Sequence, residues 1–472
     1  MNNNNQVIIK IPEKLKSEIL IMINIKPPSF PYSIDGFLYI ISKIIQIPMY
    51  NRKYEKLNKI PLYSKILRKE LGKHYKRYLE YLIDNGYLET DNHYIVSSPE
   101  NEGKCKCYAL TKKYKKCKLI DHSITKKTIL RKILQWKKEF LGNNVNDEML
   151  GKLYDMLKNF SIDIDSAKIY MQNLVDTGVL SQTKMDIEID KCKRINSKDE
   201  SDLAIFISKD SYNRVHTNFT NLSKHIRENF LYVNGKKAIG VDIVSSQASM
   251  LYTLMDNYVD NLENHSHKTM FELLDMNTSQ PRVDVRNKYV NNRNNYTGGH
   301  IYDGHLNDSI PYIKNETLET IITKARIELK QFNHILRSEG IYEYFQEKWD
   351  IINQENKSRS YIKKQWITYV FGQGKGKAVT KMDRLWQIEF PVITNLMNHL
   401  KHGDYKALSH TLQRNEAELI FNKVCPRIDT EFNVPYCTVH DSVIVAEDQV
   451  DDIAFLFDQI LDENGVITGV AY

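Results

Sequence analysis

Apolar residues recur at helical spacing in the segment that follows Ser64, and this pattern predicts a helix capped by that serine. The apolar positions are Leu71, Tyr75, Tyr78, Leu79 and Leu82. Gly86 stands where such a helix would end, because glycine is favoured at helix C-termini. The next residues, GYLETDNHYIV, alternate between apolar and polar positions and predict a strand hairpin with a turn near Asp91 and Asn92. Residues 33–118 are therefore predicted to form helices followed by a hairpin.

The rest of the chain divides into a helical middle and a mixed C-terminal part. Residues 119–199 are mostly helical in pattern and are predicted to be a connector or a thumb-like element. Residues 200–472 mix short apolar strands with helices, and the polar stretch at 287–309 is predicted to be a surface insertion. Together with residues 1–118, these parts give three predicted domains in an α+β chain of 472 residues.

Positive charge is concentrated in the first predicted domain. The whole chain has 66 Lys and Arg against 59 Asp and Glu, and a net charge of +7 fits many soluble proteins. The stretch KCKCYALTKKYKKCK, residues 104–118, holds seven lysines and no acidic residue. Helices followed by a hairpin with a basic wing resemble a winged helix-turn-helix module, in which one helix lies in a groove of the nucleic acid and the wing lies on phosphates. A generic small α+β domain is the alternative.

The cysteines and the N-terminal residues indicate the compartment. Six cysteines in 472 residues are too few for a disulfide scaffold, so we expect a reducing compartment, the cytoplasm. Residues 1–6 are polar and charged residues follow soon after them, so no signal peptide is expected. The most apolar early run, GFLYIISKIIQIPM, contains Lys43 and is too short to span a membrane. No membrane partner is therefore expected.

Two aspartates stand in apolar, strand-like segments of the C-terminal part. Asp242 lies in AIGVDIV, which passes into the helical pattern SSQASMLYTLM, so this residue is expected to be at least half buried. Asp441 lies between two apolar runs in YCTVHDSVIVAED, at the tip of a predicted hairpin. Each alone fits an ordinary structural aspartate. On neighbouring strands, however, carboxylates 199 residues apart (441 − 242) can share divalent metal ions, which prefer oxygen ligands.

A third segment, RSYIKKQWITYVFGQGKGK, predicts a helix that ends near Gly372. Arg359, Lys363 and Phe371 are separated by multiples of four residues and so share one face. Two cations and a ring suit a nucleoside triphosphate, since the cations bind phosphates and the ring stacks on the base. An amphipathic helix with an incidental basic edge is the alternative. The GQGKGK run lacks the spacing of a phosphate-binding Walker motif.

Taken in order, the three segments resemble motifs A, B and C of the superfamily that joins family A DNA polymerases and single-subunit RNA polymerases. Motif A resembles VDIVSSQASML, with Asp242 as the metal ligand. Motif B in that family is Arg, three residues, Lys, seven residues and Tyr-Gly, and here Phe371 replaces the tyrosine. Motif C is His-Asp followed by Glu in the DNA enzymes and by Ser in the RNA enzymes. It is matched here by His440, Asp441 and Ser442.

Two flanking segments extend the resemblance, which covers about residues 200–472. DSYNRVHTNFTNL resembles the segment before motif A, with Arg214 in the place of an arginine near the template–primer. Asn213 stands where the family commonly has glycine. SHTLQRNEAELIF resembles the helix before motif C, with Gln413 in the place of a glutamine that contacts the primer side.

The resemblance implies a right-hand fold of palm, fingers and thumb and a polymerase that adds nucleotides to a primer 3′ end on a template. It implies that Asp242 and Asp441 hold two Mg²⁺ ions and that the backbone carbonyl of Ile243 completes one coordination sphere. Arg359 and Lys363 would neutralise the phosphates, and Lys363 would also protonate the leaving group.

The resemblance also implies the contacts with bases, primer and partners. Phe371 would stack near the incoming base, Gly372 would let the template base approach closely, and His440 would support the primer terminus. The implied partners are a DNA template–primer and nucleoside triphosphates. A winged-helix-like front without a segment for a proofreading exonuclease is typical of a virus, plasmid or mobile element.

Three residues bear on whether the product is DNA or RNA. Gln247 lies five residues after Asp242, where the DNA enzymes place a bulky acidic residue that excludes the ribose 2′-hydroxyl. Phe371 lacks the hydroxyl that the RNA enzymes use near that sugar, so both residues favour DNA, whereas Ser442 favours RNA. We therefore predict a DNA polymerase, with a DNA-directed RNA polymerase or primase-polymerase as the alternative. A non-catalytic replication-initiation DNA-binding protein is the competing hypothesis from another class.

Overall fold

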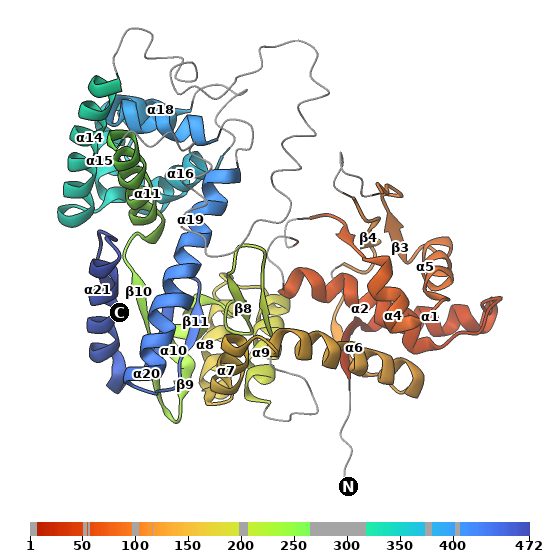
Figure 1. Ribbon diagram of the computed structural model, residues 1–472. Coiled ribbons are helices and arrows are strands. Elements are labelled where there is room, and N and C mark those ends of the chain that lie inside the picture. The colour runs from red at the N-terminus through yellow and green to blue at the C-terminus, as the bar shows by residue number, and fades with distance from the viewer. Residues whose placement is uncertain are drawn as a thin grey trace, which may run out of the picture. The chain divides into compact units, whose positions relative to one another are not determined.

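The computed structural model describes residues 7–50, 54, 57–96, 103–115, 117–197, 206–264, 318–372, 380–401 and 406–472. In these residues the chain combines α-helices and β-strands, as predicted (Figure 1). It forms two compact units, of which the first comprises residues 1–208, 216–238 and 435–437 and the second residues 209–215, 239–434 and 438–472. The predicted insertion at 287–309 lies outside the described residues.

The first unit begins with a module of short strands and helices, called here the N-terminal module. Its elements are β1 (Ile8–Pro12), α1 (Glu13–Ile25), α2 (Ile34–Tyr50), β2 (Ile60–Pro61), α4 (Ser64–Leu71), α5 (Tyr75–Asp84), β3 (Leu88–Thr90), β4 (Cys107–Leu110) and β5 (Leu119–Ser123) (Figure 1). β2, β4 and β3 form an antiparallel sheet in that order, and β1 pairs with β5. Helices thus precede an antiparallel strand pair, as predicted, but the turn predicted near Asp91 and Asn92 is wrong, because β3 pairs with β4 and Ile95 still bridges Lys104.

The helix predicted after Ser64 forms, but as two helices, and Ser64 is the first residue of α4, with Tyr63 at the cap position. The five apolar positions predicted for its buried face are all buried, and they share one hydrophobic core with α2 and the hairpin. Gly72 has φ +81, a conformation that glycine adopts without steric cost, and it ends α4 before α5 begins. Gly86, at φ +71, follows the end of α5 as predicted. The apolar spacing continues across Gly72, so the pattern did not reveal the break.

A buried carboxylate fixes the start of α2. The side chain of Asp35 is 5% exposed, and its oxygens accept hydrogen bonds from the N–H groups of Thr125 (2.8 Å) and Lys126 (2.6 Å). The Thr125 hydroxyl (3.1 Å) and His122 Nε2 (2.8 Å) complete the shell. Burial alone would raise the pKa of Asp35, but the hydrogen bonds from His122, Lys126 and Thr125 outweigh it and lower the pKa. These contacts tie α2 to the end of β5 and to the start of the next helix.

Helices dominate the rest of the first unit. They are α6 (Lys127–Val145), α7 (Glu148–Leu157), α8 (Ile164–Asp176), α9 (Gln182–Asn196) and α10 (Lys224–Phe230). β6 (Phe160–Ile162) pairs antiparallel with β9 (Leu231–Val233), and β7 (Ile207–Lys209) pairs with β8 (Val215–Thr217). A buried ion pair joins Lys191 to Glu188 at 2.6 Å, and Glu188 also accepts a hydrogen bond from the N–H of Ser223 at 3.1 Å. This pair attaches α9 to the start of α10.

The second unit is built on the strand β10 (Lys236–Ile243), whose last residues belong to it. Its other strands are β11 (Cys437–Val439), β12 (Ser442–Ala446) and β13 (Val470–Ala471). β10 pairs with β12, β12 pairs with β11, and the end of β10 also pairs with β13. The helices are α11 (Ser246–Glu263), α14 (Leu318–Ser338), α15 (Ile341–Asn353), α16 (Arg359–Phe371), α17 (Lys381–Glu389), α18 (Pro391–Leu400), α19 (Lys406–Glu418), α20 (Cys425–Glu431) and α21 (Val450–Glu463).

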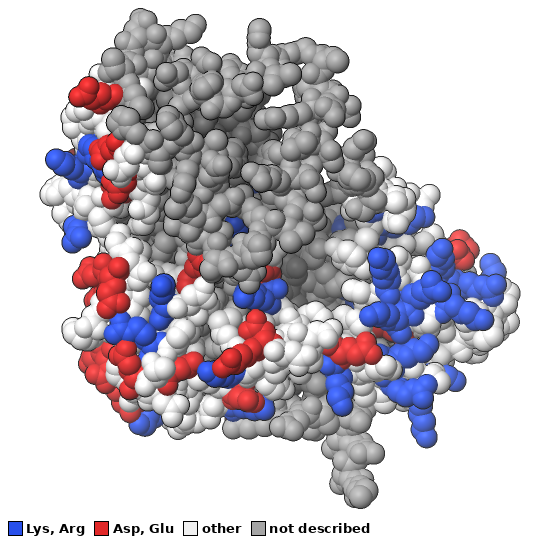
Figure 2. Space-filling view, in the orientation of Figure 1, with Lys and Arg blue, Asp and Glu red and all other residues white. Residues whose placement is uncertain are grey.

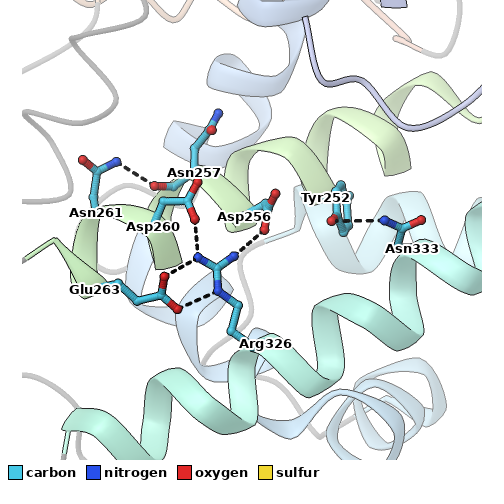
Figure 3. Close-up of polar contacts among 8 residues, drawn as sticks. All are labelled: Tyr252, Asp256, Asn257, Asp260, Asn261, Glu263, Arg326 and Asn333. Atoms are coloured by element: carbon cyan, nitrogen blue, oxygen red, sulfur yellow. Dashed lines mark hydrogen bonds and ion pairs between the residues drawn. The ribbon is translucent and has the colours of Figure 1, made fainter. Parts of the chain in front are cut away.

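One arginine clamps α11 to α14, as Figure 3 shows. Arg326 of α14 points at three carboxylates of α11: it donates to Asp256 at 2.7 Å, to Glu263 at 2.7 and 2.8 Å, and to Asp260. Further along the same pair of helices, Asn333 donates to the hydroxyl of Tyr252 at 3.3 Å. The clamp fixes α11, the helix that begins directly after β10.

A long helical rod carries the last part of the fold before β11. α19 and α20 are joined without a break by a π-helical turn at Leu419–Val424, and α19 packs against α11, α16 and α18. In a π-helix each turn holds more residues than in an α-helix, so such turns are rare and recur beside functional sites. The turn is mostly buried, with Ile420 and Val424 fully so.

Candidate active site

The two aspartates singled out in the sequence lie on neighbouring strands of the second unit. Asp242 is the last but one residue of β10, and Asp441 lies in the turn between β11 and β12, at the predicted hairpin tip. The N–H of Ile243 donates to the backbone carbonyl of Asp441 at 3.4 Å. The fold therefore brings together two residues that are 199 positions apart in the sequence (441 − 242).

The local backbone makes this approach close. A Cβ atom on Gly240 of β10 would lie 3.0 Å from the hydroxyl of Ser442 on β12, which is tighter than most side chains tolerate. His440 has φ +59, in the left-handed region, so the chain reverses sharply and presents Asp441 at the tip of the hairpin. Asp242 and His440 are exposed, whereas Asp441 is partly buried. The two carboxylates therefore differ in their access to water.

Asp441 lies in surroundings that disfavour its negative charge. Burial raises its pKa to about 7, and the charges of Glu416 and Asp242 contribute to this increase, while Arg214 opposes it. Like charges held near one another in a partly dry site repel strongly, because water screens them poorly there. This carboxylate is therefore not compensated by the protein alone.

A third carboxylate, Glu416 of α19, forms the centre of a polar cluster. Its side chain is only 2% exposed, and its oxygens accept hydrogen bonds from Arg214, from the hydroxyl of Ser246 at 2.9 Å and from the amide of Gln247. Ser246 and Gln247 are the first residues of α11, so Glu416 joins α19 to the segment directly after β10. Arg214 and Gln247 were both predicted to be site residues, and the structure brings them together on one carboxylate.

A tight turn between β7 and β8 presents Arg214. The side chain of Asp210 accepts hydrogen bonds from the N–H groups of Tyr212 (2.8 Å) and Arg214 (3.0 Å). The N–H of Asp210 donates to the carbonyl of Arg214 at 3.0 Å, which closes the turn. Asn213 has φ +65, a left-handed conformation that glycine and asparagine adopt most readily. Asparagine is therefore compatible with this turn, at a position where the resembling family commonly has glycine.

The predicted basic helix forms as α16, and its two cations meet one aromatic ring. The guanidinium carbon of Arg359 lies 5.3 Å and the ammonium of Lys363 lies 5.2 Å from the ring centre of Tyr342 on α15. Arg359 also forms an ion pair with Glu343. Burial raises the pKa of Tyr342, Arg359 opposes the increase and the charge of Asp441 adds to it. Tyr342 is therefore within electrostatic reach of the two cations and of Asp441.

The end of α16 has a local reason for its glycine. Phe371 is the last residue of the helix, and a Cβ atom on Gly372 would collide with the backbone carbonyl of Thr368. The buried ammonium of Lys401 donates to the carbonyl of Tyr369 at 2.6 Å, and burial lowers the pKa of Lys401 to about 8. A cation at a helix C-terminus stabilises the orphan carbonyls there. The position of Gly372 thus follows from the helix end itself.

Two residues of this site, Glu416 and Tyr342, were not predicted from the sequence, and a third, Gln413, was predicted to have a different role. Glu416 was missed although it lies on the buried face of α19 with Ser409 and Leu412, a spacing that places an acidic residue in an apolar stripe. Tyr342 was missed because nothing in the sequence links it to the basic helix. Gln413, predicted to contact the primer, lies on α19 one turn before Glu416 and is partly buried.

Comparison with known proteins adds no family to this picture: no model of a protein family and no curated protein matches the chain. Within the described residues, no helix has the length and apolarity needed to cross a bilayer. Over the same residues, three or more His, Cys, Asp or Glu side chains nowhere converge to hold a metal ion. The metal site expected from the sequence has fewer side-chain ligands than such a group, since it consists of two carboxylates and one backbone carbonyl.

Proposed function

We propose that this chain is a template-directed nucleic-acid polymerase whose metal ligands are Asp242 and Asp441. The observation that carries the proposal is the approach of these residues on neighbouring strands, joined through the N–H of Ile243. A second observation supports it, since Arg359 and Lys363 meet at a tyrosine that lies within reach of the charge on Asp441. Nucleotidyl transfer needs carboxylates that hold cations and, beside them, protein cations that hold phosphates.

The residues present fit a divalent cation. The pKa of Asp441 is raised by burial, Glu416 and Asp242, and a positive ion would relieve that repulsion. Asp242, Asp441 and the backbone carbonyl of Ile243 would supply hard oxygen ligands of the kind that Mg²⁺ prefers. When bound, two Mg²⁺ ions would lower the pKa of the primer 3′-hydroxyl and neutralise charge on the phosphates.

The basic helix would hold the triphosphate. The ion pair with Glu343 and the ring of Tyr342 restrain Arg359, so its guanidinium is already oriented before a substrate arrives. Lys363 is exposed, and its ammonium rests on the ring of Tyr342, where it can bind a phosphate and transfer a proton to the leaving pyrophosphate. Phe371, at the end of the same helix, would stack on the incoming base.

The N-terminal module would bind DNA as a winged helix-turn-helix. Support comes from the order α2, β2, α4, α5, β3, β4, with β4 between the other two strands, and from its surface charge. Figure 2 shows Lys and Arg side chains gathered over this module. The exposed basic residues include Lys65, Arg68, Lys69, Lys73, Lys76 and Arg77 on the helices and their turn, and Lys104, Lys106, Lys112 and Lys115 on and after the hairpin. In this arrangement α5 would enter a groove and the hairpin lysines would contact phosphates.

The product we favour is DNA, and we expect three residues to contact the primer or template strand. Gln247 lies at the start of α11 and is bulky enough to exclude a ribose 2′-hydroxyl. Arg214, Gln413 and His440 would contact the primer or template strand. An RNA polymerase or primase-polymerase is the second candidate, favoured by Ser442 directly after Asp441.

Incorporation of labelled nucleotides tests the proposal. Wild type, Asp242→Ala and the control Asp165→Ala, which changes an exposed aspartate of α8, are given dNTPs or NTPs with primed and unprimed DNA templates. We expect wild type and the control to extend the primer with Mg²⁺, and Asp242→Ala to lose about a thousandfold or more in rate. Wild type that binds DNA but incorporates neither kind of nucleotide would overturn the proposal in favour of a non-catalytic DNA-binding protein. Extension with NTPs alone would assign the chain to RNA synthesis.

A further inference from the structure

Glu416 controls the orientation of a neighbouring side chain. A carboxylate can only accept hydrogen bonds, so the Gln247 side chain must turn its NH₂ group toward Glu416. The carbonyl oxygen of the same amide, Oε1, then faces away from Glu416. Ser246 donates to the same carboxylate oxygen at 2.9 Å, and Arg214 pairs with the other one, so three donors hold Glu416 in place.

Two atoms of this cluster are left without a partner. Gln247 Oε1 and Arg214 Nε are buried, and neither has a hydrogen-bond partner in the described part of the chain. A buried acceptor without a partner costs free energy, and native structures leave few of them. A ligand that brings a hydroxyl group to Gln247 would satisfy its Oε1. Gln247 binds Glu416, whose charge acts on Asp441, so such a hydroxyl would belong to a molecule bound beside the two aspartates.

We infer that Glu416 is a positioning residue for sugar recognition: it holds Gln247 with its carbonyl oxygen toward the incoming nucleotide, where that oxygen accepts a hydrogen bond from a sugar hydroxyl. This inference rests on the proposed polymerase function. It gives Gln247 a second property besides the bulk proposed above, namely an oriented carbonyl oxygen that accepts a hydrogen bond from the sugar. Because Gln247 is proposed to exclude the 2′-hydroxyl by its bulk, the hydroxyl that its carbonyl oxygen accepts from is the 3′-hydroxyl of a dNTP, and a bond to the 2′-hydroxyl is the outcome expected if the chain makes RNA.

The variants separate hydrogen bonding from bulk. Gln247→Met keeps the length of the side chain and removes the acceptor. Glu416→Gln keeps the shape of Glu416 but also offers an NH₂ group, so the amide of Gln247 can turn over. The matched control is Glu418→Gln, two residues further along the same helix and partly buried. For each variant, kcat/KM is measured with a dNTP, the corresponding NTP and the 2′,3′-dideoxy-NTP, which separates the two hydroxyl positions.

We expect Gln247→Met and Glu416→Gln each to change the preference among the three nucleotides by about tenfold, as the loss of one hydrogen bond predicts. The double variant should change it no more than either single one, because the two residues act as a unit. Glu418→Gln should keep the wild-type ratios. If wild type uses the dideoxy-NTP more slowly than the dNTP and the variants lose this difference, the hydrogen bond comes from the 3′-hydroxyl. If wild type uses the NTP faster than the dNTP and the variants lose that difference, it comes from the 2′-hydroxyl.

Two results would overturn the inference. One is a Gln247→Met variant with wild-type ratios, which would mean that bulk alone selects the sugar. The other is an additive double variant, which would mean that Glu416 acts elsewhere. If Glu416→Gln fails to fold, Glu416→Asp takes its place in the same measurement, because it keeps the charge but shortens the reach to the amide of Gln247. Failure of the polymerase function itself is distinguishable, because wild type would then incorporate none of the three nucleotides.

Discussion

Asp35 in the first unit and Asp441 in the second are both carboxylates that the fold removes from water, and their surroundings differ. Asp35 receives hydrogen bonds from two backbone N–H groups, a hydroxyl and a histidine, and its pKa is lowered despite its burial. Burial and the like charges of Glu416 and Asp242 outweigh the opposing charge of Arg214 at Asp441, and the pKa of Asp441 is raised to about 7. The first carboxylate is satisfied by the protein, and the second is not.

We propose that this difference separates a carboxylate that stabilises the fold from one that binds a ligand. A buried carboxylate that is fully hydrogen-bonded stabilises the native state and has no free oxygen lone pair with which to bind a ligand. A charge that the fold crowds with like charges destabilises the native state, and such groups cluster at functional sites. The predictions below test this contrast, from the largest expected effect to the smallest.

The same substitution should have opposite effects at the two aspartates. Asp35→Asn places an NH₂ group against the N–H groups of Thr125 and Lys126, so we expect a loss of about 3 kcal/mol in unfolding free energy. Asp441→Asn removes a repelled charge, so at pH 7.5 without divalent ions the stability should be unchanged or higher. Urea unfolding measures both, and hydrogen exchange of residues 119–133 localises the first effect. Equal destabilisation by the two variants would contradict the contrast.

Stability should depend on pH through Asp441. Its pKa is about 7 in the fold and about 4 in an unfolded chain, so between these values only the folded protein holds the proton. Without divalent ions, the free energy of unfolding should therefore fall as the pH rises from about 4 to 7. Mg²⁺ at pH 7.5 should restore stability in wild type, because it binds the ionised carboxylates.

The matching control for this pH effect is Asp441→Asn. In this variant the decrease in stability between pH 4 and pH 7 should be smaller, and Mg²⁺ should have little effect at pH 7.5. Urea midpoints across this range, with a chelator or with Mg²⁺, measure both. A wild-type profile that matches the variant would show that Asp441 is not the repelled group.

The clamp at Arg326 should contribute less, because it is closer to water. Its three carboxylate partners are 34, 52 and 39% exposed, so solvent screens the ion pairs. We expect Arg326→Gln to lower the unfolding free energy by about 1 kcal/mol, since it leaves three carboxylates of α11 facing one another. Repeating the urea titration in 1 M salt should shrink the loss, whereas a loss that persists would indicate packing instead of charge.

The lysines after the hairpin should affect DNA binding without affecting stability. Replacing both Lys112 and Lys115 by Ala removes two exposed cations of the N-terminal module, whereas the control pair Lys152 and Lys168 lies on α7 and α8. If both lysines contact phosphates, the slope of the logarithm of the binding constant against the logarithm of the salt concentration should become less negative by about 2. Fluorescence anisotropy with duplex DNA at several salt concentrations measures it. An equal loss in the control pair would exclude a specific role for the hairpin.

Local patterns predicted the local parts of this molecule. The buried face of α5 and the extent of α16 follow from spacings within a few turns, and both are confirmed. The hairpin after α5 forms, but the turn predicted near Asp91 and Asn92 is wrong, because β3 pairs with β4 at Cys107–Leu110. The break at Gly72 escaped prediction because the apolar spacing keeps its phase across the glycine. Winged-helix identity, the three domains and the polymerase function stay predictions.

Only those site residues that belong to a recognisable sequence motif could be predicted. Asp242 and Asp441 were paired through a resemblance, and the structure places them on neighbouring strands. Glu416 was not found, because its partners Ser246 and Arg214 are 170 and 202 positions away and no local pattern encodes such contacts. Sequence spacing therefore identified the aspartates and missed the carboxylate that organises the residues around them.

The π-helical turn at Leu419–Val424 has a consequence for how this protein can vary. Deleting one residue there would convert it toward an α-helical turn and rotate the two ends of the rod by about 100° against each other. Glu416 would then face a different neighbour while α20 kept its packing. A one-residue change in length, with no alteration of any side chain, would thus separate the carboxylate of Glu416 from the amide of Gln247.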